Sequence, residues 1–182
     1  MTSSIPQLIE SCGFCRAGEV EGLQKMKTGM TNRSYSFFAR GGQYIIRVPG
    51  EGTEQMINRA QEHAVYSVIA PLGISEEVHY FDPVSGIKIS SFLKGMHTCR
   101  PDDWEEVALC MRALRSFHGR KLHVEHSFDL WERIDFYESL WNGEKSLYAD
   151  YRQTKETVLS LRRFIDAQPK ILQLCHIDSL KF

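Results

Sequence analysis

Residues 174–182 read LCHIDSLKF, and this stretch decides how the rest of the sequence is interpreted. Its apolar residues lead directly into His176 and Asp178, two positions apart. A His-x-Asp after a buried strand is typical of the start of a phosphotransfer catalytic loop, whose pattern is His-x-Asp-x-x-x-x-Asn. Counted from His176, the asparagine would fall one position beyond Phe182. The preceding residues are then expected to form a scaffold that brings ATP to this loop.

The composition favours a folded chain with a real core, because 42% of its 182 residues are hydrophobic and 11% are aromatic. This length suits one domain or two small lobes. The net charge of −1 and the scattered basic residues exclude a general nucleic-acid binder. No apolar run approaches ~18 residues, so no membrane span is expected. The first residues also lack the features of a signal peptide, which predicts a cytoplasmic protein.

Cys12 and Cys15 form a C-x-x-C pair. A redox site of the thioredoxin type expects a strand before the pair and a long helix after it, and here a loop with glycine follows. A zinc site needs further ligands, and the other three cysteines are dispersed. Incidental, reduced thiols are the favoured interpretation.

The first half of the chain predicts five strands and two helices. Alternating apolar residues favour strands over 19–27, 33–39, 43–48, 76–81 and 86–92, with a hairpin turn at Gly41 and Gly42. A short helix is expected over 5–12. A longer helix capped by Thr53 should end at Pro71. Its predicted buried face comprises Met56, Ile57, Ala60, Ala64, Val65, Val68 and Ile69.

The second half reads as helical. One helix should begin after Asp102 or Asp103 and stop at Gly119, another should begin after Asp129, and a third should span 148–167. The helix that begins after Asp102 or Asp103 is expected to bury Trp104. A short apolar strand is expected over 171–175. The predicted class is α+β, with a nucleotide-binding lobe (1–92), a hinge (93–101) and a partial helical lobe (102–182) ending in the catalytic loop.

Four segments carry a resemblance to a known family: residues 29–35 (GMTNRSY), 44–48 (YIIRV), 58–62 (NRAQE) and 175–178 (CHID). With them the chain resembles the choline/ethanolamine kinase family, in particular the bacterial choline kinases related to aminoglycoside phosphotransferases. The resemblance runs from about Leu23 to the end and implies a protein-kinase-like fold. The protein-kinase pattern itself differs, because Gly-x-Gly-x-x-Gly is absent and Arg47 replaces the usual third-strand lysine.

The turn formed by Gly29, Met30, Thr31 and Asn32 could offer backbone N–H groups and side-chain donors to phosphate oxygens. Alone, it is more typical of an ordinary hairpin turn than of a phosphate site. Arg47 would point a permanent positive charge at the phosphates. Its place in an apolar strand argues against a solvated charge and requires a partner, which the resemblance assigns to Glu62. The resemblance further implies that the backbone of Ser91 and Leu93 binds adenine.

Asp178 is the expected catalytic base, which would accept the proton of the substrate hydroxyl. His176 is expected to fix the loop, with its imidazole packed inward. His118, His123 and His126 do not have the spacing of a metal site, and His118 is expected to be structural at a helix end.

The resemblance implies ATP and Mg²⁺ as cofactors and choline or another small amino alcohol as substrate. The family's metal ligands, a loop asparagine and a later aspartate, would lie beyond Phe182. The 182-residue chain is therefore expected to be C-terminally truncated, inactive or nearly so, and prone to self-association through its exposed helical lobe. Two alternatives stay open: an aminoglycoside or other small-molecule kinase, and a nucleotide-binding module without catalysis.

Overall fold

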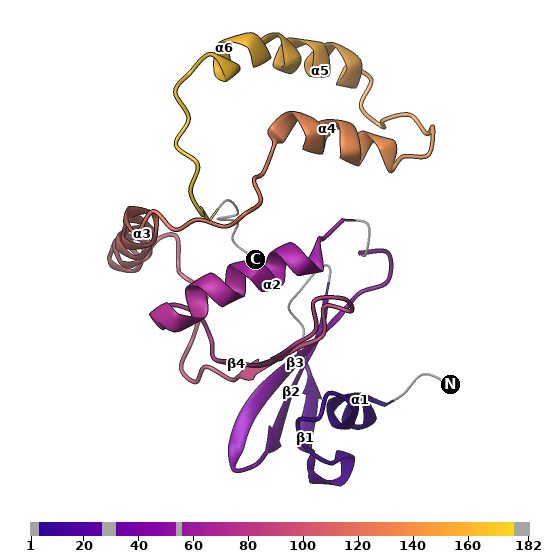
Figure 1. The fold of residues 1–182 in the computed structure, drawn as a ribbon, viewed down its shortest axis with the longest axis vertical. Helices are drawn as coiled ribbons and strands as arrows, with labels where there is room; N and C mark the ends of the chain where they lie inside the picture. The colour runs from indigo at the N-terminus through magenta and orange to yellow at the C-terminus, as the bar shows by residue number, and fades with distance from the viewer. Residues whose placement is uncertain (1–3, 27–31, 54–55, 177–182) are drawn as a thin grey trace.

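The computed structural model describes residues 4–26, 32–53 and 56–176. An N-terminal sheet with two α-helices is followed by a helical part (Figure 1). The elements are α1 (Ile5–Ser11), η1 (Ala17–Glu19), β1 (Glu21–Lys25), β2 (Asn32–Ala39), β3 (Gly42–Pro49), α2 (Arg59–Ile69), η2 (Ala70–Leu72), β4 (Val78–Phe81), β5 (Lys88–Ser91), α3 (Trp104–Gly119), α4 (Leu130–Ser139), α5 (Tyr151–Ser160) and α6 (Arg162–Asp166).

The sheet has five strands in the order β1-β2-β3-β5-β4, and every neighbouring pair is antiparallel. This confirms the predicted α+β class. Strands β2 and β3 pair without interruption from Asn32 opposite Pro49 to Ala39 opposite Gly42. Their turn consists of Arg40 and Gly41, both with positive φ, as a two-residue hairpin of type I′ requires. The turn therefore lies one residue earlier than predicted.

The hydrophobic core lies on the sheet face that α1 covers. Phe37 of β2, Ile46 of β3 and Ile89 of β5 point to this face and are fully buried. From the N-terminal segment, Ile9 and Phe14 complete the cluster, and the Phe14 ring meets that of Phe37 edge-on at 6.0 Å. Because side chains alternate along a strand, the residues between these three point to the opposite face.

The opposite face is covered by α2, which lies across the sheet between the strands and the helical part (Figure 1). Asn58 caps this helix, because its side-chain oxygen accepts the backbone N–H of Gln61 at 3.1 Å. The side chains of β3 and β5 under the helix include Arg47 and Lys88, which lie opposite each other in the register. The interface between α2 and the sheet therefore contains charged groups.

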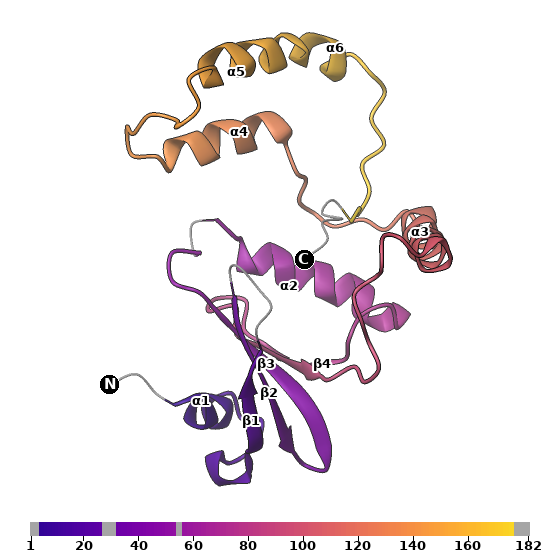
Figure 2. The same cartoon turned by 180° about the vertical axis from the view of Figure 1, so that it is seen from behind.

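The helical part begins at Asp103, whose side chain caps α3 through the N–H groups of Glu105 and Glu106. Asp129 caps α4 in the same way, as predicted. Helices α5 and α6 follow one another along one line, and α4 lies beside them (Figure 2). They are joined by a hydrogen bond from Trp131 to Asp166 and by ion pairs of Lys155 with Asp135 and Glu138. No helix in residues 4–26, 32–53 and 56–176 is long and apolar enough to span a membrane.

Several sequence predictions are wrong in detail. The α2 helix begins at Arg59, after Asn58, so Thr53 is not its cap and the Met56 side chain is 46% exposed. Trp104 is 79% exposed rather than in a core. The helix expected over 148–167 is divided into α5 and α6. Residues 171–175 form no strand, although the Leu174 N–H donates to the Leu122 carbonyl at 2.6 Å.

Candidate functional site

The structure brings Arg47 of β3 and Glu62 of α2 together beneath the helix. Arg47 Nη1 lies 2.5 Å from Glu62 Oε1, and both side chains are mostly buried. Glu62 stands in the first turn of α2, where the positive end of the helix dipole favours a carboxylate. The apolar neighbours of Arg47 indicated that its charge needs a partner. That partner is Glu62, as the resemblance implied.

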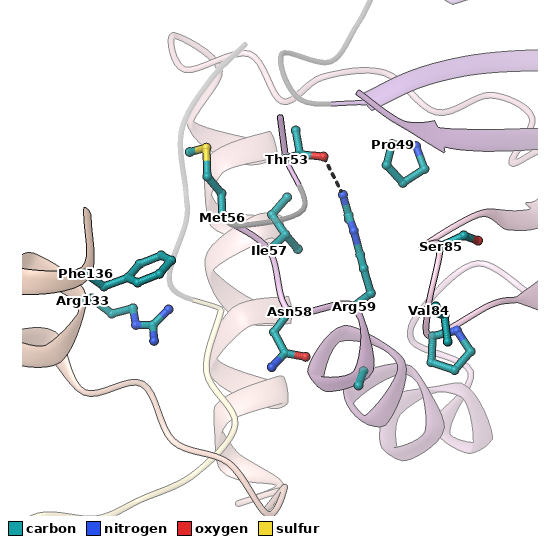
Figure 3. A pocket seen from close by; sticks show the side chains of 12 residues that line it. Pro49, Thr53, Met56, Ile57, Asn58, Arg59, Val84, Ser85, Arg133 and Phe136 are labelled. Atoms are coloured by element: carbon teal, nitrogen blue, oxygen red, sulfur yellow. Dashed lines mark hydrogen bonds between the residues drawn. The ribbon is translucent and has the colours of Figure 1, made fainter. Parts of the chain in front are cut away.

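A second arginine, which the sequence interpretation did not single out, shares the same carboxylate. Arg59 Nη1 lies 3.1 Å from Glu62 Oε2, and Arg59 Nη2 donates to Thr53 Oγ1 at 3.2 Å (Figure 3). Only 7% of Arg59 is exposed, whereas an arginine is rarely so buried without partners. Its position within the matched segment 58–62 was the signal that could have identified it.

Gly86, in the connection between β4 and β5, supports both arginines. Its carbonyl accepts a hydrogen bond from Arg47 Nη2 at 3.4 Å. A Cβ atom at this position would lie 2.6 Å from Cδ and 2.7 Å from Nε of Arg59, and the φ of Gly86 is +74°. Only glycine fits both the positive φ and the close approach of the Arg59 side chain.

Lys88 of β5 forms a second charged cluster under α2, also missed by the sequence interpretation. Its Nζ lies 2.5 Å from both Glu76 Oε1 and the Tyr66 hydroxyl, and only 5% of the residue is exposed. Burial lowers the pKa of Lys88, and Glu76 opposes that shift. Burial, followed by the charge of Glu76, raises the pKa of Tyr66. Although burial opposes it, the hydrogen bond and charge of Lys88 lower the pKa of Glu76 below its ordinary value of 4.5.

Lys88→Met is expected to destabilise the fold by about 2 kcal/mol at pH 7, because Glu76 then stays half-buried without its cation. In the parent chain the lowered pKa of Glu76 stabilises the fold above pH 4.5, and this contribution is lost as the pH falls below it. Without Lys88, burial raises the pKa of Glu76, so stability should increase as the pH falls from 7 to 5. Thermal unfolding at both pH values measures this.

The double variant Lys88→Met/Glu76→Gln serves as the control, because it has no carboxyl group at position 76 to titrate. It should show no gain in stability at pH 5 beyond that of the parent chain. A loss of stability by Lys88→Met between pH 7 and 5 would contradict the assigned role of the Lys88–Glu76 pair.

Ser91 and Leu93, the predicted adenine contacts, stand at the end of β5 and just beyond it. The Ser91 N–H donates to the Glu77 carbonyl at 2.9 Å, and its hydroxyl lies 2.7 Å from His79 Nε2. Leu93 is 48% exposed. Because the Ser91 N–H already donates to the Glu77 carbonyl, the backbone group of Ser91 that could bind adenine is its carbonyl oxygen.

The segment after Leu93 is fastened to α3. Arg100 contacts Asp103 at 2.6 Å and Glu106 at 2.7 Å. Hydrogen bonds from the Arg100 backbone and guanidinium, together with one from His97, lower the pKa of Glu106 to about 2. The irregular stretch expected to be a hinge is therefore anchored at its C-terminal end.

The two predicted catalytic residues have different outcomes. Asp178 lies outside the described residues, as do Gly29, Met30 and Thr31 of the predicted phosphate turn. His176 is described and exposed, so the expected inward packing of its imidazole is wrong. Instead, its backbone N–H donates to Nε2 of His118, at the end of α3, at 3.2 Å. This contact agrees with the structural role predicted for His118.

The register places the described residues on either side of the predicted turn near Arg47. Asn32 begins β2 opposite Pro49, and Ser34 lies opposite Arg47. On the other side of the turn, the Met26 N–H donates to the Ser34 carbonyl at 2.9 Å. Both ends of the connection between β1 and β2 therefore lie at the end of the sheet that carries Arg47.

A pocket of about 420 Å³ opens beside this charged network. Thr53 and Arg59 line one side, and Arg133 and Phe136 of α4 line the other (Figure 3). In the part of the chain that the structure describes, no three His, Cys, Asp or Glu side chains gather where they could hold a metal ion. The described residues therefore do not fit a Mg²⁺ site on their own.

The five-stranded antiparallel sheet, its covering helix α2 and the helices after the linker define a protein-kinase-like fold. No sequence model of a protein family matches the chain. The protein LicA of Haemophilus influenzae is 23% identical over 154 residues, which cover 82% of this chain and 45% of that protein. The chain spans about half the length of the curated LicA proteins it matches.

Solved structures agree with this similarity. Choline kinase LicA from Streptococcus pneumoniae superimposes with a TM-score of 0.77 at 29% identity, over 96% of this chain and 60% of that one. A structure of LicA in complex with AMP gives a TM-score of 0.75 at 29% identity, and the match covers 96% of this chain and 60% of that one. A choline/ethanolamine kinase family protein from Mesorhizobium loti gives a TM-score of 0.71 at 27% identity, and the match covers 96% of this chain and 58% of that one. The resemblance to choline/ethanolamine kinases is confirmed.

Proposed function

We propose that this chain carries the nucleotide-binding part of a kinase that transfers the γ-phosphoryl group of ATP to the hydroxyl of choline or a similar small amino alcohol. The observation that carries the proposal is the buried Arg47–Glu62 pair in a fold shared with choline kinase LicA. Residues 1–92 would form the nucleotide lobe, 93–101 the hinge and 102–182 part of the helical lobe. The AMP complex of a similar protein supports nucleotide binding by this chain.

In the proposed mechanism, Arg47 holds the phosphates while Glu62 fixes its guanidinium. The backbone and side chains of residues 29–32 complete the phosphate contacts, because short turns with glycine present N–H groups to anions. The Ser91 carbonyl and the Leu93 N–H bind the edge of adenine. Such sites work mainly by positioning and charge neutralisation, so few covalent steps fall to the protein.

Asp178 would accept the proton of the acceptor hydroxyl as the phosphoryl group arrives. His176 would hold the start of the loop, because its backbone N–H donates a hydrogen bond to Nε2 of His118. In this proposal the loop carries the proton-accepting carboxylate, and His118 at the end of α3 holds the loop in place.

We further propose that residues 1–182 on their own bind ATP but turn it over slowly or not at all. The support is that the chain spans about half the length of the curated LicA proteins it matches. An aminoglycoside kinase is the second candidate, because a segment of 56 residues is 36% identical to an aminoglycoside 3'-phosphotransferase of Enterococcus faecalis. That match covers 28% of this chain, whereas the LicA match covers 82%, which favours choline.

The test is calorimetric titration of the 182-residue chain with ATP, with and without Mg²⁺, followed by turnover assays with choline, ethanolamine and aminoglycosides. We expect ATP binding that changes little with Mg²⁺, and turnover far below the ~1–100 per second typical of kinases. Ordinary turnover would contradict the proposed inactivity, and the absence of ATP binding would contradict the kinase assignment. Light scattering should precede these assays, since exposed side chains such as Trp104 and Phe164 are expected to bring copies together.

A further inference from the structure

We infer that Arg59 is a positioning residue of the nucleotide site: it takes one oxygen of Glu62 and so leaves the Arg47–Glu62–Arg59 cluster with one unneutralised positive charge for the polyphosphate of ATP. This inference rests on the proposed nucleotide binding. It assigns a function to a side chain whose buried contacts otherwise have only a structural explanation.

The geometry divides the Glu62 carboxylate between two cations. Oε1 receives Arg47 Nη1 at 2.5 Å, and Oε2 receives Arg59 Nη1 at 3.1 Å. Two guanidinium groups and one carboxylate have a net charge of +1, whereas a simple Arg–Glu pair is neutral. Arg47 Nε is also buried and has no hydrogen-bond partner among the described residues. Arg47 is therefore held by Glu62 without being fully satisfied by it.

The local structure keeps Arg59 in this place against two unfavourable effects. Arg59 is the first residue of α2, where the positive end of the helix dipole disfavours a cation. It is also only 7% exposed, so its charge is largely removed from water. Thr53 accepts its second guanidinium nitrogen at 3.2 Å, and the missing side chain of Gly86 leaves room for its stem. These contacts hold the guanidinium against Glu62 rather than in solvent.

A purely structural anchor and an electrostatic positioning residue predict different ligand dependence. Loss of an anchor would disturb the whole site, so affinities for ATP and for adenosine would fall together. Loss of the surplus charge affects only ligands that carry phosphates. Adenosine, which has none, is therefore the discriminating probe.

The experiment measures the affinities of the 182-residue chain for ATP and adenosine by calorimetry, for the parent, Arg59→Gln and Arg59→Lys. We expect Arg59→Gln to bind ATP about tenfold more weakly, with a shallower dependence on ionic strength and unchanged adenosine affinity. Arg59→Lys, which keeps the charge, should recover most of the ATP affinity. Unchanged adenosine binding also shows that the variant is folded.

If Arg59→Gln loses its cooperative melting transition, Thr53→Val replaces it, because this change keeps Arg59 and removes one of its contacts, together with the hydrogen bond from Thr53 Oγ1 to the Gly50 carbonyl. It should bind ATP about threefold more weakly with adenosine unaffected. Equal losses for both ligands, or undiminished ATP binding by a folded variant, would overturn the inference alone. No ATP binding by the parent chain would overturn the proposed function and this inference with it.

Discussion

Arg47→Met is expected to weaken ATP binding by the 182-residue chain about 100-fold, the largest effect of any single change at the site. Methionine keeps an unbranched apolar stem in the buried position but removes the charge and all its donors. Two charge-assisted hydrogen bonds to phosphate, worth about 3 kcal/mol together after desolvation, would be lost. Glu62 would still be neutralised by Arg59, so the fold should survive. Calorimetric titration with ATP measures the change.

The matched control is Arg40→Met, which makes the same charge change at the opposite end of β2 and β3. Arg40 stands in the turn beyond Ala39 and Gly42, while Arg47 lies opposite Ser34. This control should keep ATP affinity within about twofold, because exposed charges more than a Debye length apart are largely screened. If Arg47→Met and Arg40→Met weaken ATP binding equally, Arg47 has no special role.

Gly86→Ala is expected to destabilise the fold by about 3 kcal/mol, although it adds a single methyl group. An L-residue at a φ of +74° is strained by about 1 kcal/mol, and the new Cβ would lie 2.6 Å from Arg59 Cδ. Moving the buried Arg59 side chain adds about 2 kcal/mol of overpacking and weakens its contact with Glu62. Chemical denaturation with urea measures the loss.

Gly73→Ala separates the two contributions to this effect. Gly73 has a φ of +62°, and a Cβ atom there would meet no heavy atom within 4 Å. It should therefore show the backbone strain alone. In an Arg59→Ala background the cost of Gly86→Ala should shrink to that of Gly73→Ala. A cost of Gly86→Ala that is independent of Arg59 would show that the close approach does not matter.

The sheet could be predicted from the sequence because its signals are local. Alternation in β2 and β3 defined the strands, and the apolar neighbours of Arg47 indicated that its charge needed a partner. The partner itself came from the resemblance, since no local pattern states which helix residue lies over which strand. The two residues are 15 positions apart, and their contact depends on how α2 crosses the sheet.

The rest could not be predicted for two physical reasons. Gly86 and Lys88 acquire their roles only from tertiary contacts with Arg59, Glu76 and Tyr66. The helical lobe was predicted to bury Trp104 from its spacing, yet helical periodicity gives the apolar side of a helix and not what packs against it. The start of α2 was placed too early because Thr53 and Asn58 are both suitable caps.

The alternation of side chains along β3 and β5 has a consequence for how this protein can change in evolution. Ile46 and Ile89 face the hydrophobic cluster near α1, while their neighbours Arg47 and Lys88 face α2. Hydrophobic packing and charged contacts are thus assigned to alternate positions of the same strands. Selection can alter the charged side chains that face α2 while the apolar side chains on the other face preserve the core. Insertion of one residue in either strand would exchange the two sets and lose both properties at once.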